Sequence, residues 1–139
     1  MIQISSQNEL KEIYPLMHQL RVELDFEAFA KKFKLASKTQ NYKLFGFKQD
    51  SSFVAACGVM PFNVLYRDFC LYICDFVVNE NLRGKGFGQK CLTQIHKWAK
   101  DEGYKEIELS SSFPRVRAHE FYTQKMGYEK TSFVFRKKL

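Results

Sequence analysis

The sequence predicts a single α/β domain in which a central mixed sheet is flanked by helices. Its length of 139 residues suits one compact domain, so we expect one domain spanning residues 1–139. Apolar residues make up 45% of the chain, which is enough to bury a core. Some segments repeat apolar residues at helical spacing, whereas others are rich in aromatic and β-branched residues, which is typical of strands.

A short N-terminal strand and two helices are expected in the first third of the chain. Ser6 is followed three residues later by Glu9, which is the capping-box pattern of a helix N-terminus. Leu10 and the apolar residues after it recur every three to four positions. Pro15 should kink this helix or split it in two. Residues 26–33 continue the helical spacing as a second, short segment.

Three successive strands should follow as a meander. Tyr42–Phe47, Ser52–Met60 and Leu65–Val78 are rich in aromatic and β-branched residues. Asp50-Ser51 and Tyr66-Arg67-Asp68 are the turn candidates between them.

The second half continues with alternating helices and strands. Apolar spacing predicts a helix from the glycine-rich segment 84–88 to about Glu102, where Gly103 ends it. Residues 107–109 alternate apolar and acidic side chains, as in a short strand.

The last elements are expected to be a helix that begins near Pro114 and a final strand or hairpin. Gly127 should end this helix, and Tyr128–Phe135 alternates aromatic and polar residues. The whole order gives six to seven strands and about four helices.

The formal charge of +7 calls for an acidic partner, which leaves a phosphorylated cofactor, an acidic substrate or nucleic acid. The charges are dispersed, and only Lys31–Lys34 and Arg136–Lys138 form small clusters, which is typical of solvated faces. We therefore expect no nucleic-acid binding. The N-terminus lacks the pattern of a signal peptide, and no apolar run is long enough to span a membrane, so we expect no membrane partner.

The four cysteines form no CxxC pair, and we expect them to be reduced core thiols in a cytoplasmic protein. Cys70 and Cys74 fall on one expected strand without obvious partners for a metal site or a disulfide. No metal site is predicted.

The strongest chemical signal is the run Arg83-Gly84-Lys85-Gly86-Phe87-Gly88 between a strand and a helix. Glycines allow a tight turn whose backbone N–H groups, together with the helix dipole, bind an anion such as a diphosphate. The spacing fits neither a Walker loop nor a dinucleotide fingerprint. A glycine-rich turn without a ligand is the alternative, but Arg83 and Lys85 supply charge where a diphosphate needs it.

Two motifs in this order resemble the GNAT superfamily of N-acetyltransferases, and the resemblance covers nearly the whole chain. Arg83-x-x-Gly86-x-Gly88 is similar to the family's acetyl-CoA signature, and it lies between a strand and a long helix as in the family. Ala118-x-x-Phe121-Tyr122, followed by Gly127-Tyr128, resembles the family's segment in the last major helix and strand. The resemblance implies the GNAT acyl-CoA N-acyltransferase fold with acetyl-CoA as acyl donor.

The resemblance also implies cofactor contacts. Backbone amides of residues 83–88, which include Gly84 and Phe87, would bind the CoA pyrophosphate. Phe76 and Val78 would offer backbone groups to the pantetheine arm beside a strand bulge, and a backbone N–H near Val77 would polarise the thioester carbonyl. Arg115 stands where the family often has Asn, seven residues before its tyrosine, and an arginine there could reach a phosphate or a pantetheine carbonyl.

Acyl transfer to an amine calls for a base and for an acid that protonates the leaving thiolate. Tyr122 matches the family's tyrosine near the sulfur and would be the general acid; the alternative is a core aromatic. Asp75, on the strand that enters the loop, would be the base through a water, with Glu108 as second choice. The alternative for Asp75 is a solvent-facing residue or one paired with Arg67 or Lys85. We interpret His119 either as a surface histidine or as a residue that contacts the acceptor or a metal.

The acceptor is expected to be a small-molecule amine, because the run 117–122 and the ending resemble aminoalkylphosphonate-type acetyltransferases. Peptide or protein amines are the alternative, as is a non-catalytic acyl-CoA sensor. A homodimer is compatible with the sequence.

Overall fold

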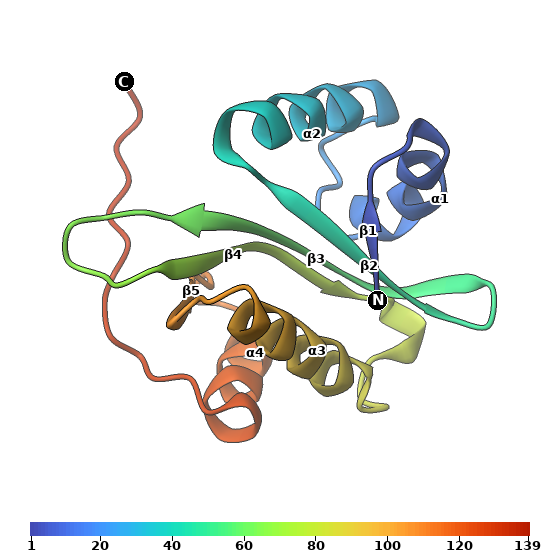
Figure 1. The fold of residues 1–139 in the computed structure, drawn as a ribbon. Helices are drawn as coiled ribbons and strands as arrows, with labels where there is room; N and C mark the ends of the chain where they lie inside the picture. Colours follow the sequence, from blue (N-terminus) through green and yellow to red (C-terminus); the bar gives the residue numbers. More distant parts are fainter. The chain divides into compact units, whose positions relative to one another are not determined.

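The computed structural model describes residues 1–139 and contains one mixed five-stranded sheet in the order β1-β2-β3-β4-β5 (Figure 1). The strands span Ile2–Ile4 (β1), Lys43–Gln49 (β2), Ser52–Phe62 (β3), Cys70–Val78 (β4) and Glu106–Leu109 (β5). Neighbouring strands from β1 to β4 run antiparallel. The α/β fold class is confirmed, whereas the expectation of six to seven strands is wrong.

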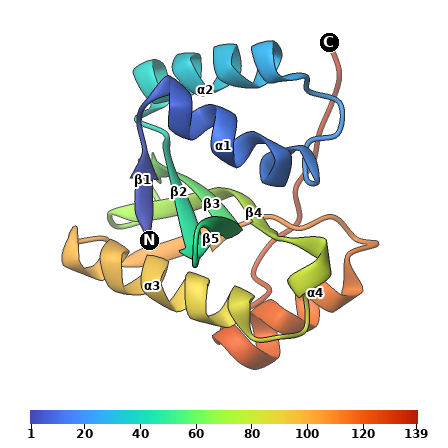
Figure 2. The same cartoon turned by 90° about the vertical axis from the view of Figure 1, so that its right-hand side faces the viewer.

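The four α-helices are α1 (Gln7–His18), α2 (Phe26–Gln40), α3 (Phe87–Asp101) and α4 (Val116–Glu120). A short 3₁₀-helix, η1, spans Glu80–Leu82, and a π-helical segment, η2, spans Phe121–Lys125. In both views, α1 and α2 lie on one face of the sheet and α3 lies on the opposite face (Figures 1 and 2). The segment that follows β4 contains η1 and leads into the start of α3.

The first helix begins as the capping box predicts. The Ser6 side chain accepts a hydrogen bond from Glu9 N, and the Glu9 carboxylate accepts one from Ser6 N at 2.9 Å. These bonds to the backbone lower the pKa of Glu9 to about 2. The helix is not split at Pro15, because α1 continues through this residue to His18. Leu16 and Met17, which follow the proline, are buried in the core, and their packing outweighs the missing hydrogen bond.

The second helix is longer than its apolar pattern indicates. We expected a short segment over residues 26–33, but α2 continues to Gln40 and ends at Asn41, which adopts a left-handed conformation. Phe29 is its only buried residue. The last two turns are rich in lysine and other polar residues, so hydrophobic periodicity could not detect them.

The strand boundaries differ from expectation in two places. The third strand of the meander begins at Cys70, not at Leu65, because residues 65–68 form the turn. The segment Tyr128–Phe135 contains no strand, although its side chains alternate, so the predicted last strand or hairpin is wrong. Alternation predicts a strand only where a neighbouring strand completes the hydrogen bonds.

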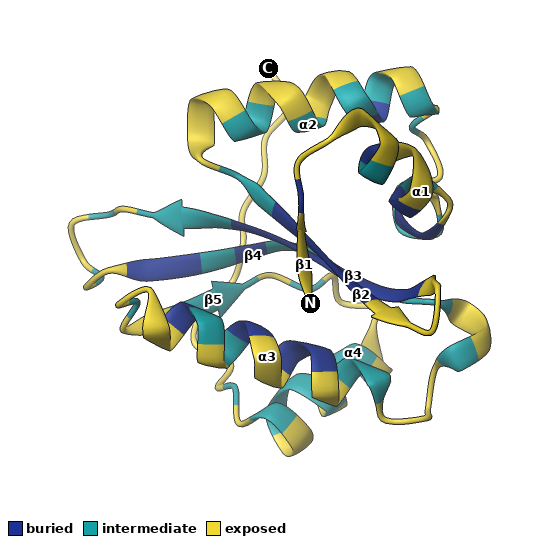
Figure 3. Ribbon diagram, turned by 45° about the vertical axis from the view of Figure 1, so that its right-hand side comes forward, coloured by how far each residue is buried: buried dark blue, intermediate teal, exposed yellow.

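The core lies on both faces of the sheet. On one face, Leu44 of β2 and Ala56 of β3 pack with buried residues of α1 such as Ile13. On the other face, α3 turns its buried residues toward the sheet and its exposed residues away from it (Figure 3). The Trp98 ring of α3 lies 4.7 Å from that of Phe45. Leu44 and Phe45, which are consecutive in β2, therefore direct their side chains to opposite faces of the sheet.

The chain consists of two compact units, Met1–Glu108 and Leu109–Leu139, and each is described by itself. The larger unit contains β1 to β4, α1 to α3 and most of β5. The smaller unit contains α4, η2 and the C-terminal segment. No helix is long and apolar enough to cross a membrane.

Candidate active site

The glycine-rich segment forms a left-handed turn that opens α3. Gly84 and Gly86 have φ angles of 79° and 83°, a conformation that favours glycine, and Gly86 is the N-cap of the helix. No side chain caps this end. The first helical hydrogen bond runs from Lys90 N to Gly86 O, so the backbone N–H groups of residues 87–89 have no helical acceptor. These N–H groups and the dipole of a 15-residue helix suit a phosphate.

Two basic side chains flank this turn, as the sequence predicted. Arg83 and Lys85 are both exposed. The Arg83 Nε donates to the carbonyl of Val78, the last residue of β4, at 3.3 Å. Arg83 is therefore anchored at the point where the strand ends.

A bulge interrupts β4 just before the segment predicted to hold the cofactor arm. Gly58 of β3 pairs with Asp75, but Val59 pairs with Ile73, so Cys74 is an extra residue in β4. A bulge bends its strand and redirects the side chains that follow it. Phe76, Val77 and Val78 come directly after it and pair with β3 up to the end of the strand. The expected bulge is present in β4.

The bulge places Asp75 on the α1 and α2 face of the sheet. Asp75 is paired with Gly58, and Gly58 is paired with Leu44, whose side chain belongs to the core under α1. Phe76, one residue later, aligns through Cys57 with Phe45, which contacts α3. Asp75 and Phe76 therefore serve opposite faces of the sheet.

Asp75 belongs to a partly buried cluster that the sequence did not reveal. Arg21, between α1 and α2, donates from Nε at 2.9 Å and from Nη2 at 2.5 Å to Asp75 Oδ1. Its Nη2 also contacts the carbonyl of the bulge residue Cys74 at 3.3 Å. Tyr42 donates its hydroxyl to Asp75 Oδ2 at 2.9 Å. The expected alternative partners, Arg67 and Lys85, do not bind Asp75; its ionic partner is Arg21.

Gly58 makes room for this cluster. A Cβ atom on Gly58 would lie 1.8 Å from the Tyr42 hydroxyl, so only glycine fits beneath the tyrosine. Burial and the charge of Asp75 raise the pKa of Tyr42 well above its usual value, which keeps its hydroxyl protonated as a donor. Burial opposes the charge of Arg21, but the carboxylate of Asp75 outweighs it, and the pKa of Arg21 is raised.

The loop that carries Arg21 is fixed at both ends. Gln19 Oε1 accepts a hydrogen bond from Glu80 N at 3.0 Å, which ties the end of α1 to η1. The Leu24 carbonyl accepts from the Tyr14 hydroxyl at 2.9 Å and lies 3.1 Å from His18 Nδ1. Arg21 therefore reaches β4 from a constrained backbone.

The second candidate base, Glu108, is also paired with an arginine. Arg67 contacts Glu106 at 3.1 Å and Glu108 at 3.5 Å. Arg67 is thus the partner of the acidic residues of β5. The Arg67 Nε atom is buried without a hydrogen-bond partner.

The remaining predicted site residues lie in the smaller unit. Arg115 is the N-cap of α4 and makes no side-chain capping bond. Tyr122 lies in η2, where its ring is 5.3 Å from Phe121 and 5.6 Å from Tyr128. Hydrogen bonds of the π-helical type inside helices often mark functional sites. His119 Nε2 lies 3.0 Å from the Ser112 carbonyl, so a local contact orients its ring.

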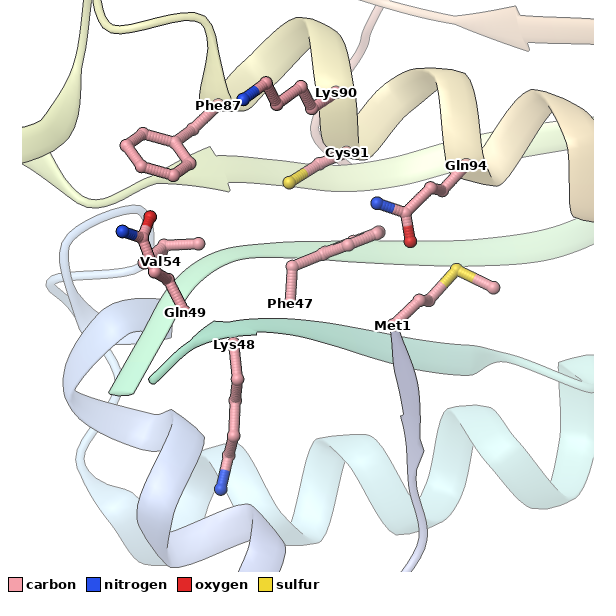
Figure 4. A pocket seen from close by; sticks show the side chains of 9 residues that line it. All are labelled: Met1, Phe47, Lys48, Gln49, Val54, Phe87, Lys90, Cys91 and Gln94. Carbon is pink, nitrogen blue, oxygen red and sulfur yellow. The ribbon is translucent and has the colours of Figure 1, made fainter. Parts of the chain in front are cut away.

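A pocket of about 240 Å³ lies between β2 and the first half of α3 (Figure 4). Phe47 and Cys91 face each other across it, and Phe87 of the glycine-rich segment closes one end. Lys48 directs its ammonium group away from the pocket, where it pairs with Glu12. The pocket shares only Phe87 with the predicted site. Cys91 in this pocket is not an activated thiol, because burial raises the pKa of its thiol to about 11.

All four cysteines are free, and Cys57, Cys70 and Cys91 are buried. No group of three or more histidine, cysteine or acidic residues is placed to hold a metal ion. The expectation of unpaired core thiols is therefore confirmed for three of the four cysteines, while Cys74 is half-buried at the bulge.

The family model described as "Acetyltransferase (GNAT) family" matches residues 7–128. The chain belongs to this family. It is 36% identical over 137 residues to the uncharacterized N-acetyltransferase YhdJ of Bacillus subtilis, covering 99% of this chain and 96% of that relative. The predicted family and the assignment as an enzyme are thereby confirmed.

Two further similarities bear on this acetyltransferase. It is 29% identical over 131 residues to the aminoalkylphosphonate N-acetyltransferase of Salmonella typhimurium, covering 91% of this chain and 83% of that enzyme. Its fold superposes on AAC(6')-Iy in complex with the bisubstrate analogue CoA-S-monomethyl-acetylneamine with a TM-score of 0.79, at 17% identity, covering 99% and 97% of the two chains. The structural match confirms the fold of this acetyltransferase.

The structure thus places part of the predicted site in one unit and shows two partners of Asp75. Asp75, the residues 76–78 and the loop 83–88 are consecutive parts of the larger unit. Arg21 and Tyr42 were missed, because they lie 54 and 33 residues from Asp75 in sequence. Only the return of β2 beside β3 and of α1 over the sheet makes them neighbours of Asp75. No local pattern signals such contacts.

Proposed function

We propose that this acetyltransferase moves the acetyl group of acetyl-CoA to the primary amine of a small molecule. The observation that carries the proposal is the uncapped N-terminus of α3 behind Gly84 and Gly86. In this proposal the CoA pyrophosphate binds the N–H groups of the loop, and Arg83 and Lys85 neutralise part of its charge. Family membership and the structure of AAC(6')-Iy with a bisubstrate analogue that contains CoA support this choice of ligand.

The cofactor arm would run along the end of β4. Its amide groups would pair with backbone groups of Phe76 and Val78, and a backbone N–H near Val77 would bind the thioester oxygen. The bulge at Cys74 supports this step, because it alters the course of β4 immediately before these residues. Arg115 would contact a phosphate or a pantetheine carbonyl.

The reaction would proceed by direct attack. The amine nitrogen forms a bond to the thioester carbonyl carbon, the carbon–sulfur bond breaks, and the thiolate takes a proton from Tyr122. The proton that the attacking nitrogen then loses would return to the Tyr122 oxygen. A free alkylamine has a pKa near 10.4, so removing its proton at pH 7 costs about 4 to 5 kcal/mol. Asp75 would receive this proton through a water. Its Oδ2 accepts one bond from Tyr42, and a carboxylate oxygen has room for a second.

The acceptor would be a small amine that carries an anionic group. The aminoalkylphosphonate N-acetyltransferase of Salmonella typhimurium supports this class, since it matches most of the chain. The net charge of +7 supports it as well, because a basic protein attracts anionic substrates.

Acetyl-CoA should raise the melting temperature of the protein, because a ligand that binds the native state stabilises it by mass action. We expect a shift that grows with concentration up to the millimolar range. Turnover is then measured as thiol release with a panel of small amines, aminophosphonates and peptides. Absence of any melting shift at millimolar acetyl-CoA would refute the cofactor assignment, and thiol release with peptides alone would refute the acceptor class.

Tyr122→Phe should lower kcat and leave the KM for acetyl-CoA nearly unchanged. A general acid acts on the leaving thiolate in the transition state and contributes little to ground-state binding. General acids contribute typically about 10² to 10⁴-fold, and the acidity of a thiol places the expected loss near or below the lower end. The effect should be strongest on the alkaline side of the pH–rate profile. An unchanged rate at every pH, under conditions where chemistry limits turnover, would show that Tyr122 has a packing role; Tyr128→Phe is the matched control.

A further inference from the structure

We propose that Arg21 is the specificity-determining residue that binds the anionic group of the acceptor amine, and this proposal rests on the proposed function. Two of the three guanidinium nitrogens of Arg21 are engaged within the chain, and the third is not. Its Nε and Nη2 bind Asp75, and Nη2 also contacts the Cys74 carbonyl. Its Nη1, which carries two N–H groups, has no hydrogen-bond partner in the chain.

The exposure of the ion pair is unequal. The Arg21 side chain is 40% exposed and that of Asp75 only 13%. A molecule that approaches the pair from solvent therefore meets the guanidinium first and the carboxylate behind it. A surface ion pair would expose both groups, and a fully buried pair neither.

This order of charges matches a zwitterionic amine. An anionic oxygen of a phosphonate, phosphate or carboxylate can bind Nη1, since the planar guanidinium suits such groups. An ammonium group a few bonds away would then lie beside Asp75, whose charge attracts it. A neutral amine of the same length gains only the second contact.

The surrounding contacts hold Arg21 in position for this task. Its backbone N–H donates to the Met17 carbonyl, and its own carbonyl accepts from Leu24 N, both at 3.0 Å. Tyr42 holds the other oxygen of Asp75, so the carboxylate cannot rotate freely around the pair. A guanidinium fixed in advance loses little entropy on binding an anion.

The test compares two acceptors of similar length, 2-aminoethylphosphonate and propylamine, in the full chain with acetyl-CoA. We expect wild-type kcat/KM to favour the phosphonate, and Arg21→Gln to lower kcat/KM for the phosphonate by about tenfold to a hundredfold more than for propylamine, as expected when a hydrogen bond to a charged group is lost. Arg21→Lys retains the charge but not the planar group, and should restore part of the preference. Arg67→Gln is the control, because it removes the same charge from another arginine paired with carboxylates.

Each outcome has a distinct meaning. Equal losses for both acceptors in Arg21→Gln would overturn the proposal, because Arg21 would then act only through Asp75. A wild-type enzyme without preference for the phosphonate, or a preference lost equally in Arg67→Gln, would also overturn it. Turnover of neither acceptor, nor of any other amine, would refute the proposed function itself, and acetyl-CoA binding by melting shift separates that failure from loss of the cofactor site.

Discussion

Replacing Gly86 with valine should weaken acetyl-CoA binding by roughly a hundredfold. Gly86 has a φ of 83°, and a β-branched residue strongly disfavours this conformation. The N-cap would shift toward negative φ and turn the N–H groups of residues 87–89 away from the diphosphate. Two lost bonds to a charged ligand weaken binding by on the order of 3 kcal/mol, which is roughly a hundredfold. Calorimetric titration with acetyl-CoA measures the loss.

The far end of the same helix offers a matched control. Gly103, just beyond α3, has a φ of 90°, and a Cβ atom there would meet nothing closer than a Phe69 ring carbon at 3.9 Å. Gly103→Val therefore introduces a similar backbone strain away from the loop. It should lower the melting temperature about as much as Gly86→Val but leave acetyl-CoA affinity unchanged. Equal affinities of Gly86→Val and the wild type would place the pyrophosphate elsewhere.

Replacing Asp75 with asparagine should produce the largest loss of activity. If Asp75 relays the ammonium proton, its loss costs about 10² to 10⁴-fold in kcat/KM near neutral pH. The rising limb of the pH–rate profile should move toward the pKa of the acceptor itself, near 10.4 for an alkylamine, so activity partly returns at alkaline pH. Stability should fall as well, by about 1 to 2 kcal/mol after allowance for the exposed side of Arg21, because this cation loses its partner.

Glu108→Gln is the control for this experiment, since Glu108 also lies on a strand and pairs with an arginine. We expect it to leave the pH–rate profile in place. A shifted profile in Glu108→Gln and a normal one in Asp75→Asn would transfer the role of base to Glu108. A uniform loss of activity in Asp75→Asn at every pH would show that Asp75 only positions the acceptor.

Local patterns determined the features of this protein that depend on a few consecutive residues. The capping box at Ser6 and Glu9 and the glycine-rich turn at Gly84 and Gly86 could be read from the sequence, because neighbouring residues alone satisfy their hydrogen bonds and φ angles. The two motifs at 83–88 and 118–128 were sufficient for the family. The order of helices and strands up to the last helix could also be predicted, because the spacing of apolar residues changes between helices and strands.

Element boundaries were less predictable where the pattern is weak or ambiguous. The polar end of α2 carries no apolar periodicity, and α1 passes through Pro15 because its flanking residues are buried. The alternating residues 128–135 form no strand, although their pattern matches one. In each case the outcome depends on contacts with other elements, which a local pattern does not contain.

The tertiary structure alone decided how the charged residues are paired. Asp75 is bound by Arg21 and Tyr42, which are distant in sequence, and Arg67 binds the acids of β5. The bulge at Cys74 and the missing side chain of Gly58 place these groups together on one face of the sheet. Such pairs form wherever the fold brings opposite charges to partly buried positions, since an unpaired charge there is unstable. Composition gives the number of charges, but only the packing of α1 and β2 against β4 selects the partners.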